Sequence, residues 1–441
     1  MPDQTGVPAP SPEIADLLPA LDPLIEQVRA AYPTEPELLE VFTDAVRNTL
    51  STTVRRKPDG TTFVATGDIA AMWLRDSSAQ VETYLRVAAT HAGLRDALVG
   101  VAKQQAAYYA IDPYANAYNE YPTDGHDEHG HDTPPPLPEV WEQKYELDSL
   151  CYPIRLAYLL WQRADTTDHL DEATLEMFRS MLALMEVEQH HEDRSPYRFQ
   201  RSGENLPPTE TLTREGKGSP TGYTGMVWSG FRPSDDACTY HYLVPANMFA
   251  AVSLDQLVEI ADEVYDDEEL AEQAKRIGRE IRAGLEAHAI VEHLVHGRIW
   301  AYEVDGLGNQ LLTDDANTPS LLSAPYVGFC APDDPTYLAT RAFVLSSDNP
   351  TYYVGTAAAG IGSPHTPPRF VWHMALTMQA MTSTDRGEKE ALVQTLLATT
   401  GGTGLMHEGF DVDDPAHFTR PWFGWANSLF AELVLRLSDQ H

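Results

Sequence analysis

The segment TEPELLEVFTDAVRNTL, Thr34–Leu50, sets the pattern that decides the fold. Its apolar residues recur every three or four positions, which places Leu38, Phe42 and Val46 on one face of a helix. Pro36 suits the first turn of such a helix, and Thr34 could cap its start. We therefore expect an amphipathic helix with one face buried in a core.

The same helical period recurs along most of the chain. Strand signals are few; the best is 294–302, which alternates and could pair across Gly297. No repeat of solenoid length is visible. These features predict an all-α chain, and many helices joined by long loops favour a toroid of helix pairs around a central cavity. The expected helices are 77–91, 94–110, 148–164, 171–188, 245–264, 268–287, 371–383, 388–399 and 421–438.

The composition limits the classes of partner. The chain has 30 basic and 66 acidic residues, a formal net charge of −36. Such a charge repels nucleic acid and anionic lipid, because phosphate binding needs clustered Lys and Arg. A neutral substrate such as a sugar is compatible with it, and so is a merely solvated acidic surface. We predict no nucleic-acid or membrane partner; the oligomeric state stays open.

The chain organisation and cysteine usage predict one cytoplasmic catalytic domain. Cys151, Cys238 and Cys330 are widely spaced and form no CxxC pair, so buried free thiols are expected. No secretory leader or long apolar run is visible. No convincing linker divides the chain, so we expect a flexible tail over 1–11 and a single domain over 12–441.

Candidate site residues lie in loops where polar and aromatic side chains crowd without helical period. Sugars offer CH faces and hydroxyl pairs, so stacking rings and bidentate polar groups suit them. Adjacent carboxyls before a helix could supply a general acid with a raised pKa, or only cap the helix. Ion pairs, core aromatics and solvated loop acids are the ordinary alternatives elsewhere. The candidates are Trp73, Arg75, Asp76, Glu142, Asp235, Asp236, Asp315, His365, Glu408, Arg420 and Trp422.

One loop of the sequence is rich in residues that could bind a metal ion. The loop 124–138 holds His126, His129 and His131 among several acids, but its ligands lack the spacing of a rigid helical site. A polar, mobile loop beside a sugar cleft fits it better than a metal centre. The chain has no Walker loop, GxGxxG or GxSxG motif. We therefore predict no metal and no cofactor.

Together these loops resemble glycoside hydrolase family 125, the exo-acting α-1,6-mannosidases. The matching stretches run in order over nearly all the chain after residue 30. They are MWLRDSSAQ (Met72–Gln80), WEQKYELDSLCYP (Trp141–Pro153), FRPSDDACTYHYLVPANMFA (Phe231–Ala250), DDANTPSLLSAPY (Asp314–Tyr326), GIGSPHT (Gly360–Thr366) and HEGFDVDDPAHFTRPWFGWAN (His407–Asn427).

The resemblance implies an (α/α)6 barrel and metal-independent, inverting release of terminal α-1,6-linked mannose from α-mannoside oligosaccharides, including N-glycan fragments. It also implies an aspartate acid in the RPSDDA motif, Asp235 or Asp236, and Glu408 as the base. We favour Asp235. Inversion requires the two carboxyls to stand roughly 6.5–9.5 Å apart. A silent mannan-binding barrel, another exo-glycosidase and a phosphorylase on the same fold remain the alternatives.

Overall fold

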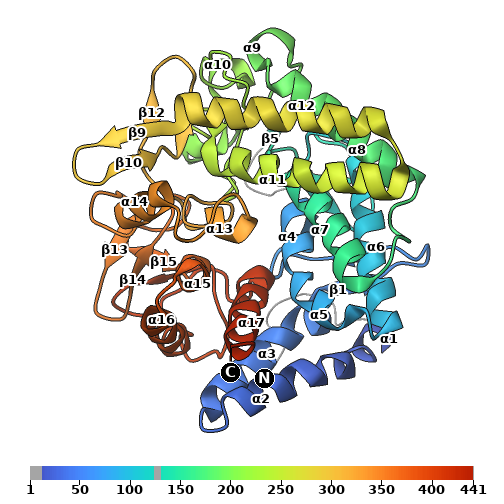
Figure 1. Cartoon of the computed structure of the whole chain (residues 1–441), viewed down its shortest axis with the longest axis vertical. Coiled ribbons are helices and arrows are strands. Elements are labelled where there is room, and N and C mark those ends of the chain that lie inside the picture. Colours follow the sequence, from blue (N-terminus) through green and yellow to red (C-terminus); the bar gives the residue numbers. More distant parts are fainter. Residues whose placement is uncertain (1–11, 124–130, 441) are drawn as a thin grey trace.

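The computed structural model describes residues 12–123 and 131–440, and in these helices form a closed ring (Figure 1). Each inner helix packs against the next one, and the last packs against the first. The ring therefore has no open edge. Its inner helices are α4 (Leu74–Ala79), α7 (Asp148–Ala164), α11 (Val244–Ile260), α13 (Ala324–Val327), α15 (His373–Thr382) and α17 (Gly424–Ser438).

A second set of helices surrounds this ring, and outer and inner helices alternate along the chain (Figure 1). This alternation is the architecture of an (α/α)6 barrel. The predicted all-α fold class is confirmed. The outer helices are α3 (Pro36–Thr52), α6 (Ala92–Tyr109), α8 (Glu172–Glu188), α12 (Glu268–Gly284), α14 (Pro335–Val344) and α16 (Arg386–Ala398).

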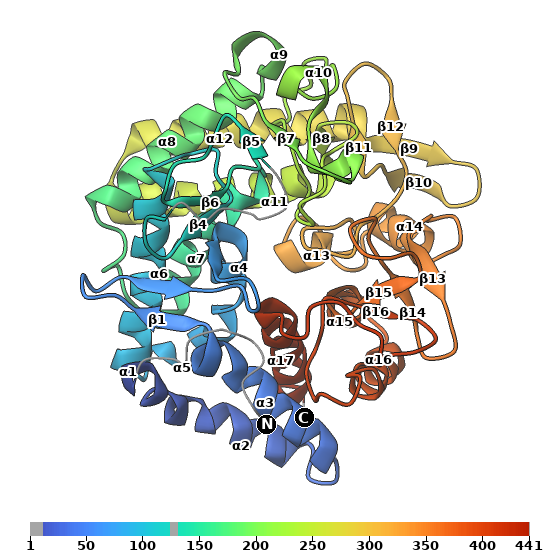
Figure 2. The same cartoon turned by 180° about the vertical axis from the view of Figure 1, so that it is seen from behind.

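Short strands form small antiparallel sheets of two or three strands between the helices. In the view from behind, several of them lie in front of the ring (Figure 2). The sheets are β1 (Val54–Arg56) with β2 (Thr62–Val64), β3 (Ala71–Trp73) with β4 (Ala117–Asn119) and β6 (Val140–Glu142), β5 (His131–Thr133) with β7 (Gln200–Ser202), β8 (Tyr242–Leu243) with β11 (Glu303–Val304) and β12 (Gln310–Leu311), β9 (Ile290–His293) with β10 (Gly297–Trp300), β13 (Tyr352–Val354) with β14 (Ala359–Ile361), and β15 (Phe370–Trp372) with β16 (Gly409–Asp411).

Short helices complete the described chain. Before the ring lie α1 (Pro12–Ala15), η1 (Leu18–Leu21) and α2 (Asp22–Ala31), and α2 packs on both α3 and α17. The others are η2 (Glu82–Tyr84), α5 (Leu85–Ala88), α9 (His191–Arg194), η3 (Pro208–Glu210), α10 (Thr213–Gly216), η4 (Ala261–Tyr265) and η5 (Leu285–Ala289).

Inner and outer helices differ in sequence as their environments require. The inner helix α11 buries Val244, Phe249 and Leu257 from different sides and is apolar around most of its circumference. The outer helix α12 buries only one stripe, which includes Ala274 and Ile281, and its other faces are charged. The ring is thus held by apolar packing on both sides of its inner wall.

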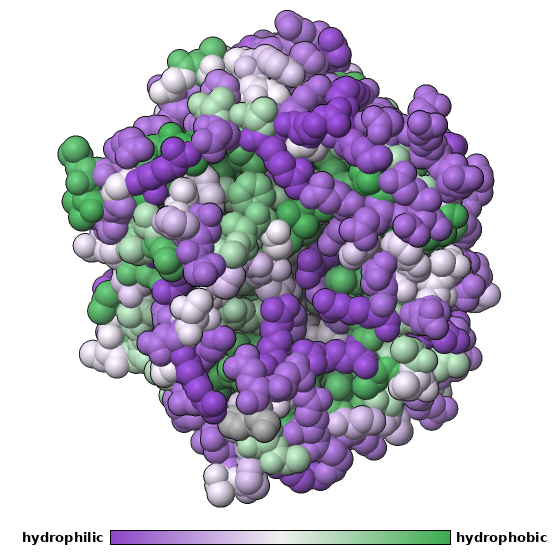
Figure 3. Space-filling model, viewed as in Figure 1, coloured by the Kyte–Doolittle hydropathy of each residue, from purple (hydrophilic) through white to green (hydrophobic). Residues whose placement is uncertain are grey.

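The surface matches the acidic composition. Hydrophilic residues cover most of the face in Figure 3, and hydrophobic residues show mainly in its central hollow and in patches at the rim. At the tip of the β9–β10 hairpin, Leu294 and Val295 are among the most exposed large apolar residues. Within the described residues, no helix combines the length and apolar character that crossing a membrane requires.

Several predicted boundaries were wrong, and each has a physical reason. The segment 77–91 is broken into α4, η2 and α5 rather than forming one helix. The helix α3 is capped by Glu35 with no side-chain hydrogen bond, so Thr34 is not its cap. The segment 294–302 turns at its own start: β10 pairs with β9, and Gly297 lies opposite His293 rather than at the turn.

Two asparagines clamp equivalent loops at opposite parts of the ring. The side chain of Asn247, in the first turns of α11, accepts from Val227 N and donates to Val227 O and Leu243 O. Asn427, at the same place in α17, accepts from Met406 N and donates to Met406 O and Phe423 O. Both side chains are fully buried. Each amide therefore satisfies loop backbone groups that water cannot reach.

We expect Asn427→Ala to lower the free energy of unfolding by about 2–4 kcal/mol, because it leaves one buried N–H and two buried carbonyls without a partner. Equilibrium denaturation would measure this. The control is Thr395→Ala on the outer helix α16, where the Thr395 hydroxyl donates to Ala391 O of its own helix. If the two variants were equally stable, the Asn427 side chain would not stabilise the loop as inferred.

Candidate active site

The loops that precede the inner helices meet at one end of the ring. Outer and inner helices alternate, so all inner helices run in the same direction and begin at this end. Two adjoining pockets open there, and they share Ile69, Trp73, Asp235 and His365. The inner pocket is also lined by Arg75, Asp76, Trp372, Glu408 and Arg420; the outer pocket, of about 480 Å³, is also lined by Trp141, Glu142, Lys144 and Glu210.

Arg75, in the first turn of α4, is surrounded by acids. Its guanidinium contacts Glu146, lies 3.3 Å from Asp148 Oδ2 and 3.4 Å from Asp76 Oδ2, and its Nη2 is 3.7 Å from Asp235 Oδ1. Burial alone would lower the pKa of Arg75, but the surrounding carboxylates raise it well above its usual value. Arg75 is therefore a fixed cation that holds four acids from three separate segments of the chain.

The neighbouring aspartates Asp235 and Asp236 face different surroundings. Asp235 has a backbone φ of +67° and lines both pockets, with 26% of its side chain exposed. Asp236 is buried and its Oδ1 lies 3.4 Å from His365 Nδ1. Only Asp235 therefore presents a carboxyl to the space where a ligand could lie.

His365 is a cation in this site. Burial lowers its pKa, but the hydrogen bond to Asp236 and the charges of Glu408 and Asp235 outweigh it and raise the pKa of His365 to about 9. His365 in turn favours the ionised form of Asp236. Burial raises the pKa of Asp236, but the hydrogen bond to His365 outweighs burial and the pKa is lowered. The pair is ionised at neutral pH.

Glu408 lines the inner pocket from the loop before α17. Arg420 Nη1 lies 4.0 Å from Glu408 Oε1, while Arg420 Nε donates to Asp68 Oδ1 at 2.7 Å. The Arg420 guanidinium also lies over the ring of Phe423, 4.6 Å from its centroid. Asp68 and Phe423 thus fix the Arg420 guanidinium beside the Glu408 carboxyl.

Glu142 belongs to the wall of the outer pocket. It accepts from Asn116 Nδ2 at 2.9 Å and forms ion pairs with Lys144 and Arg201 at 3.4 and 3.2 Å. Lys144 also pairs with Glu210 at 2.9 Å. Burial lowers the pKa of Lys144, but these acids outweigh it and the pKa is raised. The outer pocket therefore has a charged floor beside the ring of Trp141.

Two of the predicted binding residues lie behind the pockets. The carboxylate of Asp315 accepts from Ser234 Oγ at 2.9 Å and Ser363 Oγ at 3.1 Å, and so ties together the loops that carry Asp235 and His365. Trp422 is buried and donates to Asn48 Oδ1 at 3.0 Å. Neither lines a pocket, so both are placed to support the loops rather than to touch a ligand.

Sequence reasoning missed several lining residues. Trp372 lines the inner pocket from β15, although its segment was predicted to be helical. Phe423 and Asn317 also line it, and Asp68 anchors Arg420. Asn317 lies within the Asp314–Tyr326 stretch, among many other polar residues, and Asp68 lies just before the Met72–Gln80 stretch. Nothing in the sequence marked Trp372 as a pocket residue, because an apolar residue before a helix usually packs in the core.

A second cavity, of about 670 Å³, lies at the opposite end of the ring. Residues from the last turns of α15 and α17 line it, together with several charged side chains. These charges pair with one another: Arg86 lies 2.9 Å from Asp439 and Arg436 lies 2.6 Å from Glu432. Its acids Glu432 and Asp439 are therefore engaged in ion pairs.

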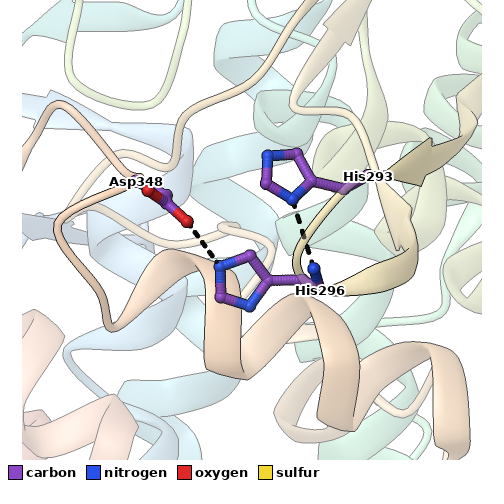
Figure 4. A group of neighbouring side chains, drawn as sticks. All are labelled: His293, His296 and Asp348. Atoms are coloured by element: carbon purple, nitrogen blue, oxygen red, sulfur yellow. Dashed lines mark hydrogen bonds and ion pairs between the residues drawn. The ribbon is translucent and has the colours of Figure 1, made fainter.

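Possible metal ligands in the described residues fall into two groups. Glu210, Asp236 and His365 lie together in the site, where the acids face the cationic His365 and Lys144. His293, His296 and Asp348 lie outside it (Figure 4).

In the outer group His296 Nε2 is 2.8 Å from Asp348 Oδ2, and His293 Nδ1 accepts from the backbone N–H groups of Val295 and His296. These bonds account for the group as a tie between the β9–β10 hairpin and the loop before β13. In the predicted His-rich loop, His126 and His129 lie outside the described residues, and Asp132 is 2.7 Å from Arg201.

Comparison with known proteins identifies the family. The model of the metal-independent α-mannosidases, GH125, matches residues 35–435. The chain belongs to glycoside hydrolase family 125. It is therefore a glycoside hydrolase, an α-mannosidase of the metal-independent kind, as the resemblance predicted.

Relatives extend this family 125 assignment. A solved Streptococcus pneumoniae structure, from a study of metal-independent α-mannosidases and described as a non-productive complex with α-1,6-mannobiose, is 45% identical with a TM-score of 0.92, covering 96% of this chain and 99% of its own. The meiotically up-regulated gene 157 protein of Schizosaccharomyces pombe is 38% identical over 96% of this chain and 86% of its length. A glycosidase at 13% identity, covering 95% of this chain and 97% of its own, has a TM-score of 0.51 and shares the fold.

The charge of His365 predicts a pH-dependent contribution to the stability of this family 125 enzyme. Its pKa in the folded protein, about 9, lies above the unfolded value of 6.5. The stabilisation is therefore fully present below the unfolded pKa and is lost as pH rises through about 9. We expect the stability difference between the native protein and His365→Gln to shrink between pH about 6 and pH about 10, as measured by denaturant unfolding at each pH.

The comparison of the two proteins at the same pH cancels the titration of groups that they share. A stability difference that stays constant over this pH range would show that His365 is uncharged at neutral pH.

Proposed function

We propose that this mannosidase releases non-reducing terminal α-1,6-linked mannose with inversion, with Asp235 as the general acid and Glu408 as the general base. The observation that carries the proposal is that both carboxyls line one inner pocket, from loops that precede different inner helices. The α-1,6 linkage rests on the mannobiose in the complex of the Streptococcus pneumoniae relative.

The choice of Asp235 over Asp236 rests on access. Asp235 lies where the two pockets join, which is where the bond between the terminal sugar and the next one would lie. Asp236 faces His365 and is absent from the lining of both pockets. Asp236 then acts by holding His365 as a cation.

The reaction needs one displacement. Asp235 donates its proton to the glycosidic oxygen as the bond from that oxygen to the anomeric carbon breaks. Glu408 takes a proton from a water molecule as the water oxygen bonds to the opposite face of that carbon. Arg420 lies beside Glu408, with Nη1 4.0 Å from Oε1. The product is β-mannose, with the shortened α-mannoside as leaving group.

The other pocket residues would hold the terminal mannose. Trp73 offers an indole face, and its buried Nε1 has no hydrogen-bond partner within residues 12–123 and 131–440. Arg75, Asp76 and His365 present fixed charges to sugar hydroxyls, which suits bidentate recognition. Glu142 and Trp141 would meet the next sugar in the outer pocket. Asp315 and Trp422 would act indirectly, by fixing the loops.

The phosphorylase alternative is less well supported. Phosphate would need uncompensated cations near the anomeric carbon. The arginines that line the inner pocket, Arg75 and Arg420, are each paired with carboxylates. A silent mannan-binding barrel stays an alternative that turnover decides. A single domain over 12–441, a cytoplasmic location and the lack of a nucleic-acid partner stay predictions of the sequence.

We expect Glu408→Gln to lower kcat on α-1,6-mannobiose by about 10²–10⁴-fold, because the water loses its base. Proton NMR of the native enzyme should show β-mannose as the first product. The matched control is Asp413→Asn, an exposed acid of the same loop that pairs with Arg369. Turnover by Glu408→Gln at the native rate would end the assignment of the base.

Chelation provides a separate test. We expect EDTA to leave hydrolysis of α-1,6-mannobiose unchanged, because the possible ligands Asp236 and His365 pair with each other and Glu210 pairs with Lys144. Initial rates before and after dialysis against EDTA would measure this. A loss of rate that Ca²⁺ or Zn²⁺ restores would instead assign a metal to Glu210, Asp236 and His365.

A further inference from the structure

The acids around Arg75 outnumber the positive charge that could neutralise them. Asp76, Glu146, Asp148 and Asp235 all lie within ion-pair distance of this one guanidinium. Three of the four side chains are almost completely buried. A buried carboxylate without full compensation is costly, so such a cluster binds protons instead of ionising completely.

Unpaired oxygens show where a proton would fit. Glu146 Oε1 and Asp235 Oδ1 are both buried, and neither accepts a hydrogen bond from any of the residues that the structure describes. Both side chains contact Arg75, Glu146 at Nη1 and Asp235 at Nη2, so the two carboxyls lie on neighbouring nitrogens of one guanidinium. Two ionised carboxylates could not satisfy these atoms, because each is only an acceptor. One proton between them turns a repulsive contact into a hydrogen bond.

The remaining contacts of Glu146 fix its position. Its Oε2 accepts from Ser149 Oγ at 2.9 Å and contacts Arg75 Nη1. Glu146 does not line either pocket, so it lies behind Asp235 as seen from the ligand. It is thus a positioning residue: it can reach the reaction only through Asp235.

The charged groups around the pair favour a proton on Glu146 while the site is empty. Burial raises the pKa of Glu146 well above its usual value. The charge of Arg75 lowers this pKa, and the charges of Asp235 and Asp148 raise it further. Burial also raises the pKa of Asp235, but Arg75, Lys144 and His365 outweigh it and leave it lowered. The proton of the pair is therefore held on the acid that cannot touch substrate.

We propose that Glu146 and Asp235 share one proton, which Glu146 holds in the empty site and returns to Asp235 for transfer to the leaving group. The proposal rests on the function proposed above, in which Asp235 is the acid.

The protons balance over one turnover. The shared proton moves from Asp235 to the glycosidic oxygen, and Arg75 then lies between two carboxylates, Glu146 on Nη1 and Asp235 on Nη2. Glu408 releases to solvent the proton that it took from water, and the pair regains one proton from solvent. No metal or further reactant is needed.

Glu146→Gln tests this through the pH profile of kcat/KM. The glutamine keeps the shape but removes the like charge that retains the proton, so the pKa of Asp235 falls. We expect the alkaline limb on α-1,6-mannobiose to move to lower pH by about one unit or more. The comparison variant is Asp148→Asn, which removes a charge from the same Arg75 but is not hydrogen bonded to Asp235. An equal shift in both variants would overturn proton sharing in favour of a general charge effect.

A substrate whose leaving group needs no proton separates this role from a structural one. We expect Glu146→Gln to lose at least about tenfold in kcat on α-1,6-mannobiose, and to lose little on 2,4-dinitrophenyl α-mannoside. Equal losses on the two substrates would overturn the proposal, since a distorted site would slow both. Circular dichroism and thermal unfolding would show that the variant is folded.

Asp235→Asn keeps this test distinct from that of the proposed function. It should lose hydrolysis of α-1,6-mannobiose and retain that of the dinitrophenyl mannoside. If it retains hydrolysis of mannobiose, the acid assignment fails and proton sharing fails with it. If Asp235→Asn behaves as expected while Glu146→Gln keeps the native pH profile, only the proton sharing is wrong.

Discussion

The direction of the inner helices is the constraint on which the rest of the structure depends. Because outer and inner helices alternate, α4, α7, α11, α13, α15 and α17 all begin at one end of the ring. The loop before each of them reaches that end, and these loops carry the pocket residues. Helix N-termini carry partial positive charge, so this end also favours a site built from carboxylates. Residues far apart in sequence thus meet without any long insertion.

The site is held by charge compensation rather than by apolar packing. Arg75 and Arg420 each contact acids from different segments, and His365 pairs with Asp236. Asp315 ties two of these loops through serine hydroxyls. Buried ion pairs of this kind add little to stability, because desolvation opposes the attraction. What they supply is orientation. The large apolar core of the ring provides the stability, and the asparagine clamps connect core to loops.

The sequence was informative where its pattern was long. Helix α7 begins and ends where the helical period of 148–164 does, and the six motif stretches supply most of the pocket lining. Strands of two to four residues escaped prediction because alternation needs a longer run to be visible. Trp422 looked like a stacking wall, but hydrogen bonding to Asn48 places it in the interior. Asp235 and Asp236 differ in backbone conformation. Two identical adjacent residues in a sequence give no indication of such a difference.

The closure of the ring joins early and late segments of the chain. Thr49 on α3 lies 3.1 Å from Ser428 on α17, Gln27 on α2 donates to Ser438 at 2.8 Å, and α17 packs on α4. The inner pocket spans this seam, since Arg75 comes from one side of it and Glu408 from the other. During synthesis on the ribosome, the nascent chain therefore remains without a working pocket until its last helix has emerged. A chain released before that point would expose the surfaces of α3 and α4 that α17 covers. It would be inactive and open to proteolysis, rather than an enzyme of reduced rate.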